Sequence, residues 1–585
     1  MDKIAILLLD KHLRTECREV VMNKFKQLVY IRPNVKEVKK EFKTLIKHFK
    51  RAESYDKAKQ IYFLEQNLFE NVATNYIIAD VRNKINTSDE FYEEEIKFFN
   101  QELPGIMLMA KKGREAILKS KFKEDFDKEF GKHFTDTIKA SQRTMNFKVM
   151  LSLIKENNLK TDFTKKMASC KAMFKGEECN FYGILRYMQS LDREERKEAF
   201  KVFAKMYEDI SPELDELYDK MLSVRVKMSK KLKFSNYIEL AYLNRGRLDY
   251  GPKEVELFRN QVIEHIVPVC KKLYQEQEKA LGVDKLKYYD EEIMFANGST
   301  NPVGDKPYML KAAQKMYREL SKETAEFFDF MLEYEMFDLE TKPNKHLGGF
   351  CTVLPKFKAP FIFSNFNGTS ADVDVLTHEA GHAFEAYTSM REQSLFEYVS
   401  STSEINEIHS MAMEHFTYPW MEDFFGENVN KYRYSHMAKS LMVIPYMCCV
   451  DEFQHEVYKT PKMTAKERRS LWRGLEKKYM PWRDYDGNKF FDEGGFWMQK
   501  QHIFLYPFYY IDYALAQICV FELYGRMKEN KEAAWQDYYN LCKAGGSKGY
   551  FELLGLANLK SPFEEGTVQK AVDIVLDDLK TSVMG

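Results

Sequence analysis

Apolar residues recur at the spacing of an α-helix along most of this chain, and this periodicity constrains its fold more than any other feature. Phe42, Leu45 and Phe49, for example, share one helical face between charged residues. Residues 190–233 are dense in Glu, Lys, Ala, Leu and Met and indicate another helix. We therefore expect a mainly α-helical protein. Because 585 residues exceed what one compact core holds, we expect two or more lobes.

Two segments depart from the helical pattern. Residues 297–307 are punctuated by Gly and Pro, which predicts a loop. Residues 348–370 are rich in Phe, Val, Thr and Pro, and they suggest a short sheet or hairpin limited by Pro355 and Pro360. We place a soft domain boundary near residue 185, which divides the chain into a helical N-terminal lobe, 1–185, and a second lobe, 186–585.

Charge and cysteine usage exclude several classes of protein. The chain has 89 basic and 89 acidic side chains, so nothing favours nucleic acid as a partner. No stretch approaches the roughly 20 apolar residues of a membrane helix, and the apolar run at residues 4–9 is too short for a signal peptide. Nine scattered cysteines without CxxC spacing indicate reduced thiols and a cytoplasmic location. We expect the adjacent Cys448 and Cys449 to be core residues.

The strand-like segment is followed by two histidines, His378 and His382, with Glu379 between them. Histidines four residues apart lie on one face of a helix, where both imidazoles can bind one zinc ion. Glu379 points about one residue further round, towards an open coordination position, where it can take a proton from water. The alternative is a surface helix that carries two solvated histidines. We favour the metal site.

A catalytic zinc site needs a third protein ligand. Glu385 and Thr388 occupy the positions where the extended HExxHxxGxxH pattern would require Gly and His, so the ligand must come from elsewhere. Residues 400–425 predict a second helix, on which Glu404, Glu407, Met411 and Glu414 share a face. Buried carboxylates are costly unless they are paired or bind a metal. From spacing alone, Glu404 and Glu407 are near-equal candidates.

These motifs resemble the thimet oligopeptidase and oligoendopeptidase F family of zinc peptidases, and the bacterial oligoendopeptidase F branch most closely. HEAGH at 378–382 matches the family's HExGH core, and Glu407, Ser410 and Glu414 match its downstream E-x-x-S-x-x-x-E element. The first glutamate of that element is the family's third ligand, so the resemblance selects Glu407 over Glu404. We assign Glu414 to supporting the ligands, and we expect His409 to be structural or supporting rather than a fourth ligand.

Residues 502–517, HIFLYPFYYIDYALAQ, resemble the family's late segment rich in histidine and tyrosine. Phenol and imidazole groups can stabilise the negative charge that develops on the scissile carbonyl oxygen. Pro507 is expected at the first position of a helix, and Tyr509 is expected in the core. The residues predicted to act at the site are His502, Tyr506, Tyr510 and Tyr513, and the sequence does not decide which is the oxyanion donor.

The resemblance implies two helical lobes that enclose a deep channel, with residues 348–366 supplying an edge strand near the metal. It implies a zinc-dependent endopeptidase that cleaves short oligopeptides and holds one zinc ion per chain. One alternative is a metallocarboxypeptidase on a related helical scaffold, which would need a cation to hold the terminal carboxylate; Arg245, Arg247 and Arg391 are available. The other is an inactive zinc-binding scaffold. We expect no membrane and no nucleic-acid partner, and the oligomeric state stays open.

Overall fold

The computed structural model describes residues 22–584, so the apolar run at residues 4–9 lies outside the described residues. Of the structure, 72% is helical, and its two sheets have two and three strands, which confirms the mainly α fold. None of the described helices is long and apolar enough to cross a membrane.

The α-helices of the described residues follow one another in chain order and are given in three stretches of sequence. The first comprises α2 (Val35–Lys50), α3 (Tyr55–Ile85), α4 (Glu90–Leu118), α5 (Lys123–Phe130), α6 (Lys132–Thr144), α7 (Met150–Ser169) and α8 (Phe181–Tyr187). The second comprises α9 (Arg193–Lys231), α10 (Tyr237–Asn244), α11 (Pro252–Gln261), α12 (Val267–Leu281), α13 (Lys306–Leu320), α14 (Lys322–Glu333) and α15 (Ser370–Glu392). The third comprises α16 (Ser403–Phe416), α17 (Met421–Phe425), α18 (Val429–Met442), α19 (Ile444–Lys459), α20 (Ala465–Tyr479), α21 (Lys489–Asp492), α22 (Gln501–Leu505), α23 (Ile511–Glu529), α24 (Lys531–Ala544), α25 (Tyr550–Leu556) and α26 (Thr567–Met584).

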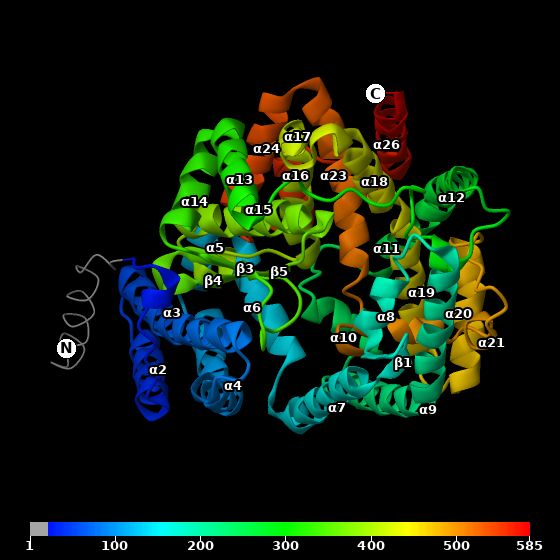
Figure 1. Ribbon diagram of the computed structural model, residues 1–585. Helices are drawn as coiled ribbons and strands as arrows, with labels where there is room; N and C mark the ends of the chain where they lie inside the picture. Colours follow the sequence, from blue (N-terminus) through cyan, green and yellow to red (C-terminus); the bar gives the residue numbers. More distant parts are fainter. Residues whose placement is uncertain (1–21, 585) are drawn as a thin grey trace.

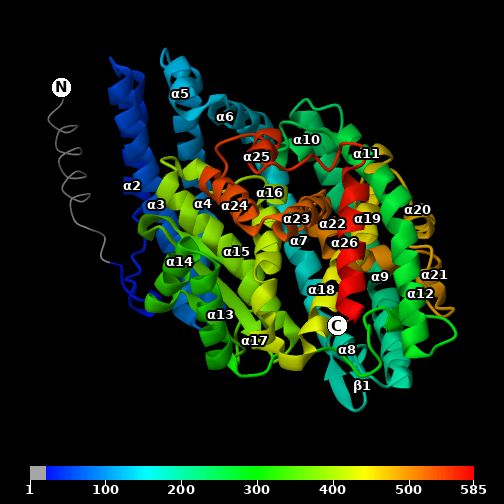
Figure 2. The same ribbon diagram turned by 90° about the horizontal axis from the view of Figure 1, so that it is seen from above.

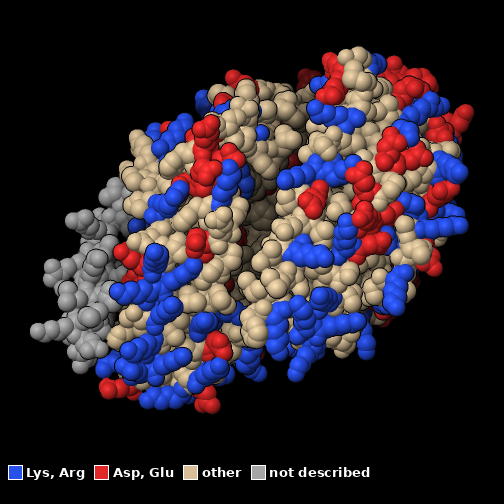
Figure 3. Space-filling view, turned by 90° about the horizontal axis from the view of Figure 1, so that it is seen from below, with Lys and Arg blue, Asp and Glu red and all other residues tan. Residues whose placement is uncertain are grey.

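The helices gather into two halves. In both ribbon views α2, α3, α4, α13 and α14 lie on one side, and α9, α12, α20 and α21 lie on the other (Figures 1 and 2). The space-filling view shows a hollow between two halves of one face (Figure 3). Helix α7 packs against α9, so the N-terminal segment contributes to both halves. The domain boundary near residue 185 stays a prediction.

A three-stranded sheet lies in the half that carries α3 and α15. Its strands are β3 (Phe337–Glu340), β4 (Phe350–Leu354) and β5 (Ala359–Phe366), in the order β3–β5–β4; a second, two-stranded sheet joins β1 (Ala172–Phe174) to β2 (Glu177–Cys179). Strand β4 runs antiparallel to β5, which confirms the predicted hairpin and makes β4 an edge strand.

Of the two prolines predicted to limit the hairpin, one does so. Pro355 does end β4, but Pro360 lies inside β5, opposite Val353, so its assignment as a strand limit was wrong. Strand β3 pairs with β5 only from Ile362 onward, so at Pro360 the strand has a neighbour on one side alone. A proline that lacks an N–H is tolerated there.

The other local predictions mostly hold. The helix predicted over residues 190–233 corresponds to α9. The loop predicted over residues 297–307 stops at Asp305, because α13 begins at Lys306. Cys448 and Cys449 are fully buried, as expected. The eight cysteines within residues 22–584 form no disulfide.

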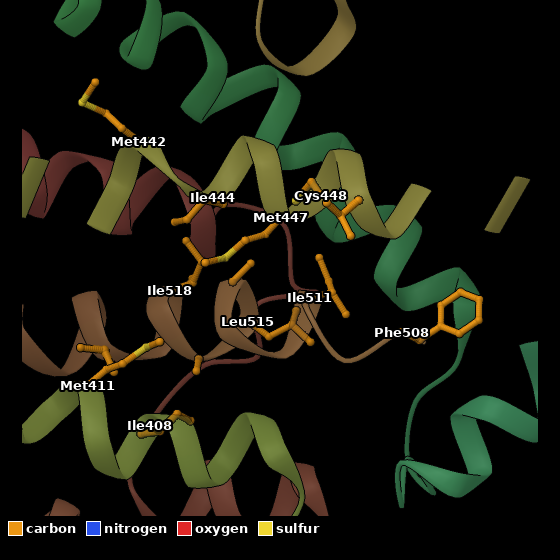
Figure 4. Packing of buried hydrophobic residues seen from close by; sticks show 14 of the residues in the cluster. Ile408, Met411, Met442, Ile444, Met447, Cys448, Phe508, Ile511, Leu515 and Ile518 are labelled. Atoms are coloured by element: carbon orange, nitrogen blue, oxygen red, sulfur yellow. The ribbon is translucent and has the colours of Figure 1, made fainter. Parts of the chain in front are cut away.

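Helices α15 and α16 cross closely at Gly381. A Cβ atom at this position would lie only 2.7 Å from the His409 carbonyl oxygen and from the Ser410 Cα, so no larger residue fits without moving a helix. On its other side α16 packs against α23, where Ile408 and Met411 meet the Leu515 and Ile518 side of the core (Figure 4). Helix α16 is therefore held between α15 and α23.

Candidate metal centre and active site

Two adjacent helices bring the three predicted metal ligands together. His378 and His382 lie one turn apart on α15, with ring centroids 5.1 Å apart and ring planes at 86°. Glu407 on α16 places Oε2 3.5 Å from Nε2 of His378 and 3.6 Å from Nε2 of His382. One ligand atom from each of the three residues lies within 4.8 Å of the others.

This donor set fits zinc. Two ligands at about 2.0–2.2 Å in a tetrahedral arrangement lie roughly 3.3–3.5 Å from each other, close to the separations between these atoms. Both histidines are partly exposed and Glu407 is buried, so one side of the group faces solvent. Two imidazoles and one carboxylate leave a fourth position open, as catalytic zinc sites require.

Glu414 fixes the orientation of His378. Nδ1 of His378 donates a hydrogen bond of 2.6 Å to Oε1 of Glu414, which leaves Nε2 for a metal. The second oxygen of Glu414 accepts a 2.7 Å hydrogen bond from Nε2 of His436, whose Nδ1 accepts one of 2.6 Å from the Tyr418 hydroxyl. Sequence reasoning missed His436 because α18 is not adjacent to the motif and its histidine has no diagnostic spacing.

The two carboxylates of this network are held ionised. Burial alone would raise the pKa of Glu407, but the adjacent His378 and His382 outweigh burial and hold its pKa far below the ordinary value. In the same way burial would raise the pKa of Glu414, yet His378 and His436 lower it strongly. Anionic Glu407 suits a cation, and anionic Glu414 suits a His378 that keeps its Nδ1 proton.

The other candidate carboxylate, Glu404, lies in a different network. It is fully buried, and its Oε1 accepts a 3.0 Å hydrogen bond from Tyr250. Burial and then Asp512 raise its pKa, while Arg247 opposes them. Glu404 is not among the side chains that meet at the histidine pair.

Glu379 lies between the zinc-fitting group and the edge strand. It is partly exposed on α15, and a Cβ atom at Gly349, just before β4, would lie 3.9 Å from its Oε1. The predicted general base and the start of β4 are therefore neighbours, and β4 is paired on one side only, with β5.

The predicted histidine and tyrosine segment lies beside Glu407, but its arrangement differs from the prediction. The Tyr509 hydroxyl donates to Oε1 of Glu407 at 3.1 Å and lies 3.1 Å from the Tyr513 hydroxyl, so the assignment of Tyr509 to the core was wrong. Tyr510 instead accepts a hydrogen bond from Lys500 at 3.1 Å, and Tyr506 is 53% exposed.

The helix after Pro507 begins later than predicted. Phe508 has a left-handed backbone with φ of 61°, which interrupts the helical path, and α23 starts only at Ile511. The Phe508 amide donates to Gln454, and its carbonyl accepts from Arg247. These contacts pin the turn that presents Tyr509.

Two further histidines, His502 and His409, had predicted roles. His502 lies on α22, with its ring stacked 5.7 Å from that of Tyr509. Burial, then Lys500 and Arg245, lower the pKa of His502 to about 4, so its imidazole is neutral at pH 7. His409 is fully buried and takes no part in the group around Glu407; its structural role stays a prediction.

A cavity of about 510 Å³ borders the site. Glu414 and Tyr510 line it on the side of the site, and most of its remaining wall is aromatic or methionine side chains: Tyr274, Tyr288, Met294, Met411, Met442, Tyr446, Met447, Met480, Trp482 and Phe496. Charged side chains, namely Glu291, Glu292, Lys439 and Arg483, line the cavity as well.

Comparison with known proteins gives the family. The chain matches the M3 peptidase N-terminal domain over residues 25–145 and peptidase family M3 over residues 186–572. The second match covers more than half of the chain, so the chain belongs to peptidase family M3.

Solved structures show the same fold. PZ peptidase A with inhibitor 2 is 42% identical, with a TM-score of 0.89 over 95% of this chain and 99% of that one. A protein from Bacillus anthracis strain Ames assigned as oligoendopeptidase F is 40% identical, with a TM-score of 0.85 over 95% and 98%. These likenesses confirm the resemblance to oligoendopeptidase F.

A curated relative is more distant. The oligoendopeptidase F homolog of Borreliella burgdorferi is 24% identical over 399 residues, which are 66% of this chain and 65% of that protein. The chain thus spans slightly less than two thirds of the length of this relative.

Proposed function

We propose that this protein is a zinc-dependent endopeptidase that hydrolyses short oligopeptides. One observation carries the proposal: Nε2 of His378, Nε2 of His382 and Oε2 of Glu407 lie close to one another, and the helix of the two histidines also carries Glu379. Membership of peptidase family M3 and the likeness to PZ peptidase A support it.

His378, His382 and Glu407 would hold one zinc ion per chain. When bound, zinc supplies Lewis acidity, which activates water and polarises the scissile carbonyl. Glu414 orients His378 by accepting the proton of Nδ1, and His436 in turn holds Glu414. Such supporting contacts typically raise metal affinity by about 10- to 100-fold.

Glu379 acts as the general base. Its carboxylate takes a proton from the attacking water and then passes it to the leaving amine. The start of β4 lies beside it, and the unpaired main-chain groups of this edge strand can bind an extended peptide as one more strand. Such pairing would bring a scissile bond alongside Glu379.

Phenol groups stabilise the oxygen that gains charge. Burial and Glu407 raise the pKa of both Tyr509 and Tyr513, so these hydroxyls stay protonated and can donate. Of the four predicted residues, Tyr513 is the one linked to Glu407, through Tyr509. His502, Tyr510 and Tyr506 form the surrounding wall, where they contact the bound peptide.

The test is Glu379→Gln, which keeps the shape of the side chain but cannot accept the proton. We expect cleavage of a short fluorogenic peptide to fall by at least about 10²- to 10⁴-fold, with zinc content near one per chain. Glu392→Gln, on an exposed position of the same helix, is the matched control and should behave as wild type. A Glu379→Gln protein that loses its zinc would show that this glutamate is a ligand.

A metallocarboxypeptidase is a second candidate, because Arg245 is a cation that makes no direct ion pair among the described residues. The products decide between the two: an endopeptidase cuts internal bonds, whereas a carboxypeptidase releases single C-terminal residues. Bound zinc without hydrolysis of any peptide would indicate an inactive scaffold instead.

We also propose a cytoplasmic location and a domain boundary near residue 185. The eight unpaired cysteines of the described chain support a reducing compartment. Limited proteolysis that cuts between residues 146 and 185, in the gap between the two matched domains, would support the boundary.

A further inference from the structure

Arg245 is a cation near the site that makes no direct ion pair among the described residues, although Asp512 acts on it at longer range. Within residues 22–584 its guanidinium makes no ion pair and no hydrogen bond, although the side chain is partly buried. The other two candidate arginines do make hydrogen bonds. Arg247 donates to Asp512 and to the Phe508 carbonyl, each at 2.6 Å. Arg391 donates to two main-chain carbonyls, at 2.8 and 2.9 Å.

The surrounding contacts hold Arg245 next to the proposed metal ligands. It caps the C-terminus of α10, two residues before the buried Arg247 that anchors this segment to α23. The Arg245 guanidinium lies 4.7 Å from the centre of the Tyr509 ring, and the Tyr509 hydroxyl donates to Glu407. One tyrosine ring therefore separates Arg245 from the ligand set.

Lys500 is a second cation next to a tyrosine ring of this segment, that of Tyr510. Its Nζ lies 4.2 Å from the centre of the Tyr510 ring, and it too lacks an ion pair in the described part of the chain. His502 contacts both Tyr509 and Tyr510 and is neutral at pH 7. The positive charge around this loop therefore comes from Arg245 and Lys500.

We infer that Arg245, with Lys500 beside it, binds a carboxylate of the peptide substrate. Partly buried N–H donors without an acceptor are costly, and a bound carboxylate accepts from a guanidinium in the geometry that this group prefers. An extended peptide advances about 3.3 Å per residue, so this carboxylate lies about two or three residues from the scissile bond. It is either the C-terminal carboxylate of a short peptide or the side chain of Asp or Glu.

This inference rests on the proposed function, and kinetics test it first. One peptide is prepared with a free C-terminus, as the C-terminal amide, and with Glu in place of Gln at each position flanking the cut. Wild-type protein should prefer one carboxylate-bearing form by about 10- to 100-fold in kcat/KM, mainly through KM. Arg245→Gln should abolish that preference, Arg245→Lys should restore part of it, and Arg391→Gln should leave it unchanged.

The pattern of preference identifies the source of the carboxylate. Preference for the free acid over the amide identifies the C-terminus, and preference for Glu over Gln identifies a side chain. Because the readout is a ratio between two peptides, a general loss of activity in Arg245→Gln cancels. Equal use of all forms by wild type, or a preference that survives Arg245→Gln, overturns the inference.

Binding separates this inference from the proposed function. The same peptides are titrated calorimetrically into Glu379→Gln protein and into Glu379→Gln with Arg245→Gln. A carboxylate preference that depends on Arg245, in a protein whose wild type cleaves nothing, refutes the peptidase and keeps the carboxylate site. Cleavage of the peptides without such a preference keeps the peptidase and refutes the carboxylate site.

Discussion

Three glutamates on α16 have the same side chain and three different environments. Glu407 faces the histidine pair, Glu414 lies between His378 and His436, and Glu404 faces Tyr250 in a separate buried network. Their roles follow from these neighbours rather than from their shared helical face. Glu407 is suited to a metal, Glu414 to orienting a ligand, and Glu404 to the packing of α16.

Substitution of these glutamates separates the roles. Glu407→Ala should lose zinc and activity, because two histidines alone leave a catalytic site without its third ligand. Glu404→Ala should keep about one zinc per chain, although it removes the buried acceptor of Tyr250 and so lowers stability by about 1–3 kcal/mol. Metal analysis after dialysis and a thermal unfolding scan measure both effects. Zinc retained by Glu407→Ala and lost by Glu404→Ala would reverse the assignment.

At the scale of elements, the metal site depends on how closely α15 and α16 approach. Gly381 sits at their crossing, and a Cβ there would collide with the main chain of α16. Alanine is the better helix former by about 1 kcal/mol, so propensity alone predicts that Gly381→Ala stabilises. Overpacking outweighs propensity here. We expect Gly381→Ala to destabilise the fold by about 1–3 kcal/mol and to weaken zinc binding, because Glu407 moves away from the histidines.

The matched control is Gly474→Ala on α20, where a Cβ meets no atom within 4 Å. This substitution should leave zinc affinity unchanged and stabilise the fold by up to about 1 kcal/mol. Competition with a fluorescent zinc chelator gives the affinity, and urea unfolding gives the stability. A Gly381→Ala protein that matches Gly474→Ala in both measurements would mean that the helix crossing tolerates the methyl group.

The same scale shows what the sequence could and could not predict. Helical periodicity and the β4–β5 hairpin are local patterns, and both were predictable. The proximity of His378, His382 and Glu407 followed from a motif and a resemblance. The pairing of His436 with Glu414 was not predictable, because it depends on how α18 packs beside α16. Tyr509 was misassigned because Phe508 adopts a left-handed backbone that delays α23 and turns the next ring towards Glu407.

At the scale of the whole molecule, a buried acid should make stability depend on pH. Glu65 on α3 is 5% exposed, its Oε1 lacks a hydrogen-bond partner within the described residues, and its carboxylate fills the space where a Cβ at Gly113 would lie. Burial raises its pKa to about 8, against the opposing charge of Arg114. Between pH 4.5 and 8 the carboxyl ionises in the unfolded chain but stays neutral in the folded one. Stability therefore falls as pH rises through this window.

Glu65→Gln removes this dependence, because the amide is neutral in both states. The free energy of unfolding of the variant minus that of wild type should be about 1–3 kcal/mol larger at pH 8.5 than at pH 5. Urea unfolding at the two pH values measures the gain. Glu53→Gln, at an exposed position before α3, is the control and should show none. If the variant differs from wild type by the same free energy at pH 5 as at pH 8.5, the assigned titration is refuted.

The last prediction concerns which substrates reach the site. The hollow between the two halves and the pairing edge of β4 suit a chain that enters in extended form (Figure 3). A folded protein cannot present such a strand beside Glu379 without unfolding locally, which costs free energy up to the roughly 5–15 kcal/mol of global unfolding. We therefore expect cleavage of peptides of about 5 to 20 residues and no cleavage of the same sequence inside a folded domain.

The experiment uses one cleavable sequence in three settings: as a free peptide, as a flexible C-terminal tail on a folded carrier, and inside a stable loop of that carrier. Mass spectrometry follows the three at equal concentration. We expect rapid cutting of the peptide, slower cutting of the tail, because the carrier crowds the hollow, and none of the loop. Equal cutting of tail and peptide would show that extension alone selects the substrate. Rapid cutting of the loop would rule out size selection by the two halves altogether, since a folded carrier would then reach Glu379 unhindered.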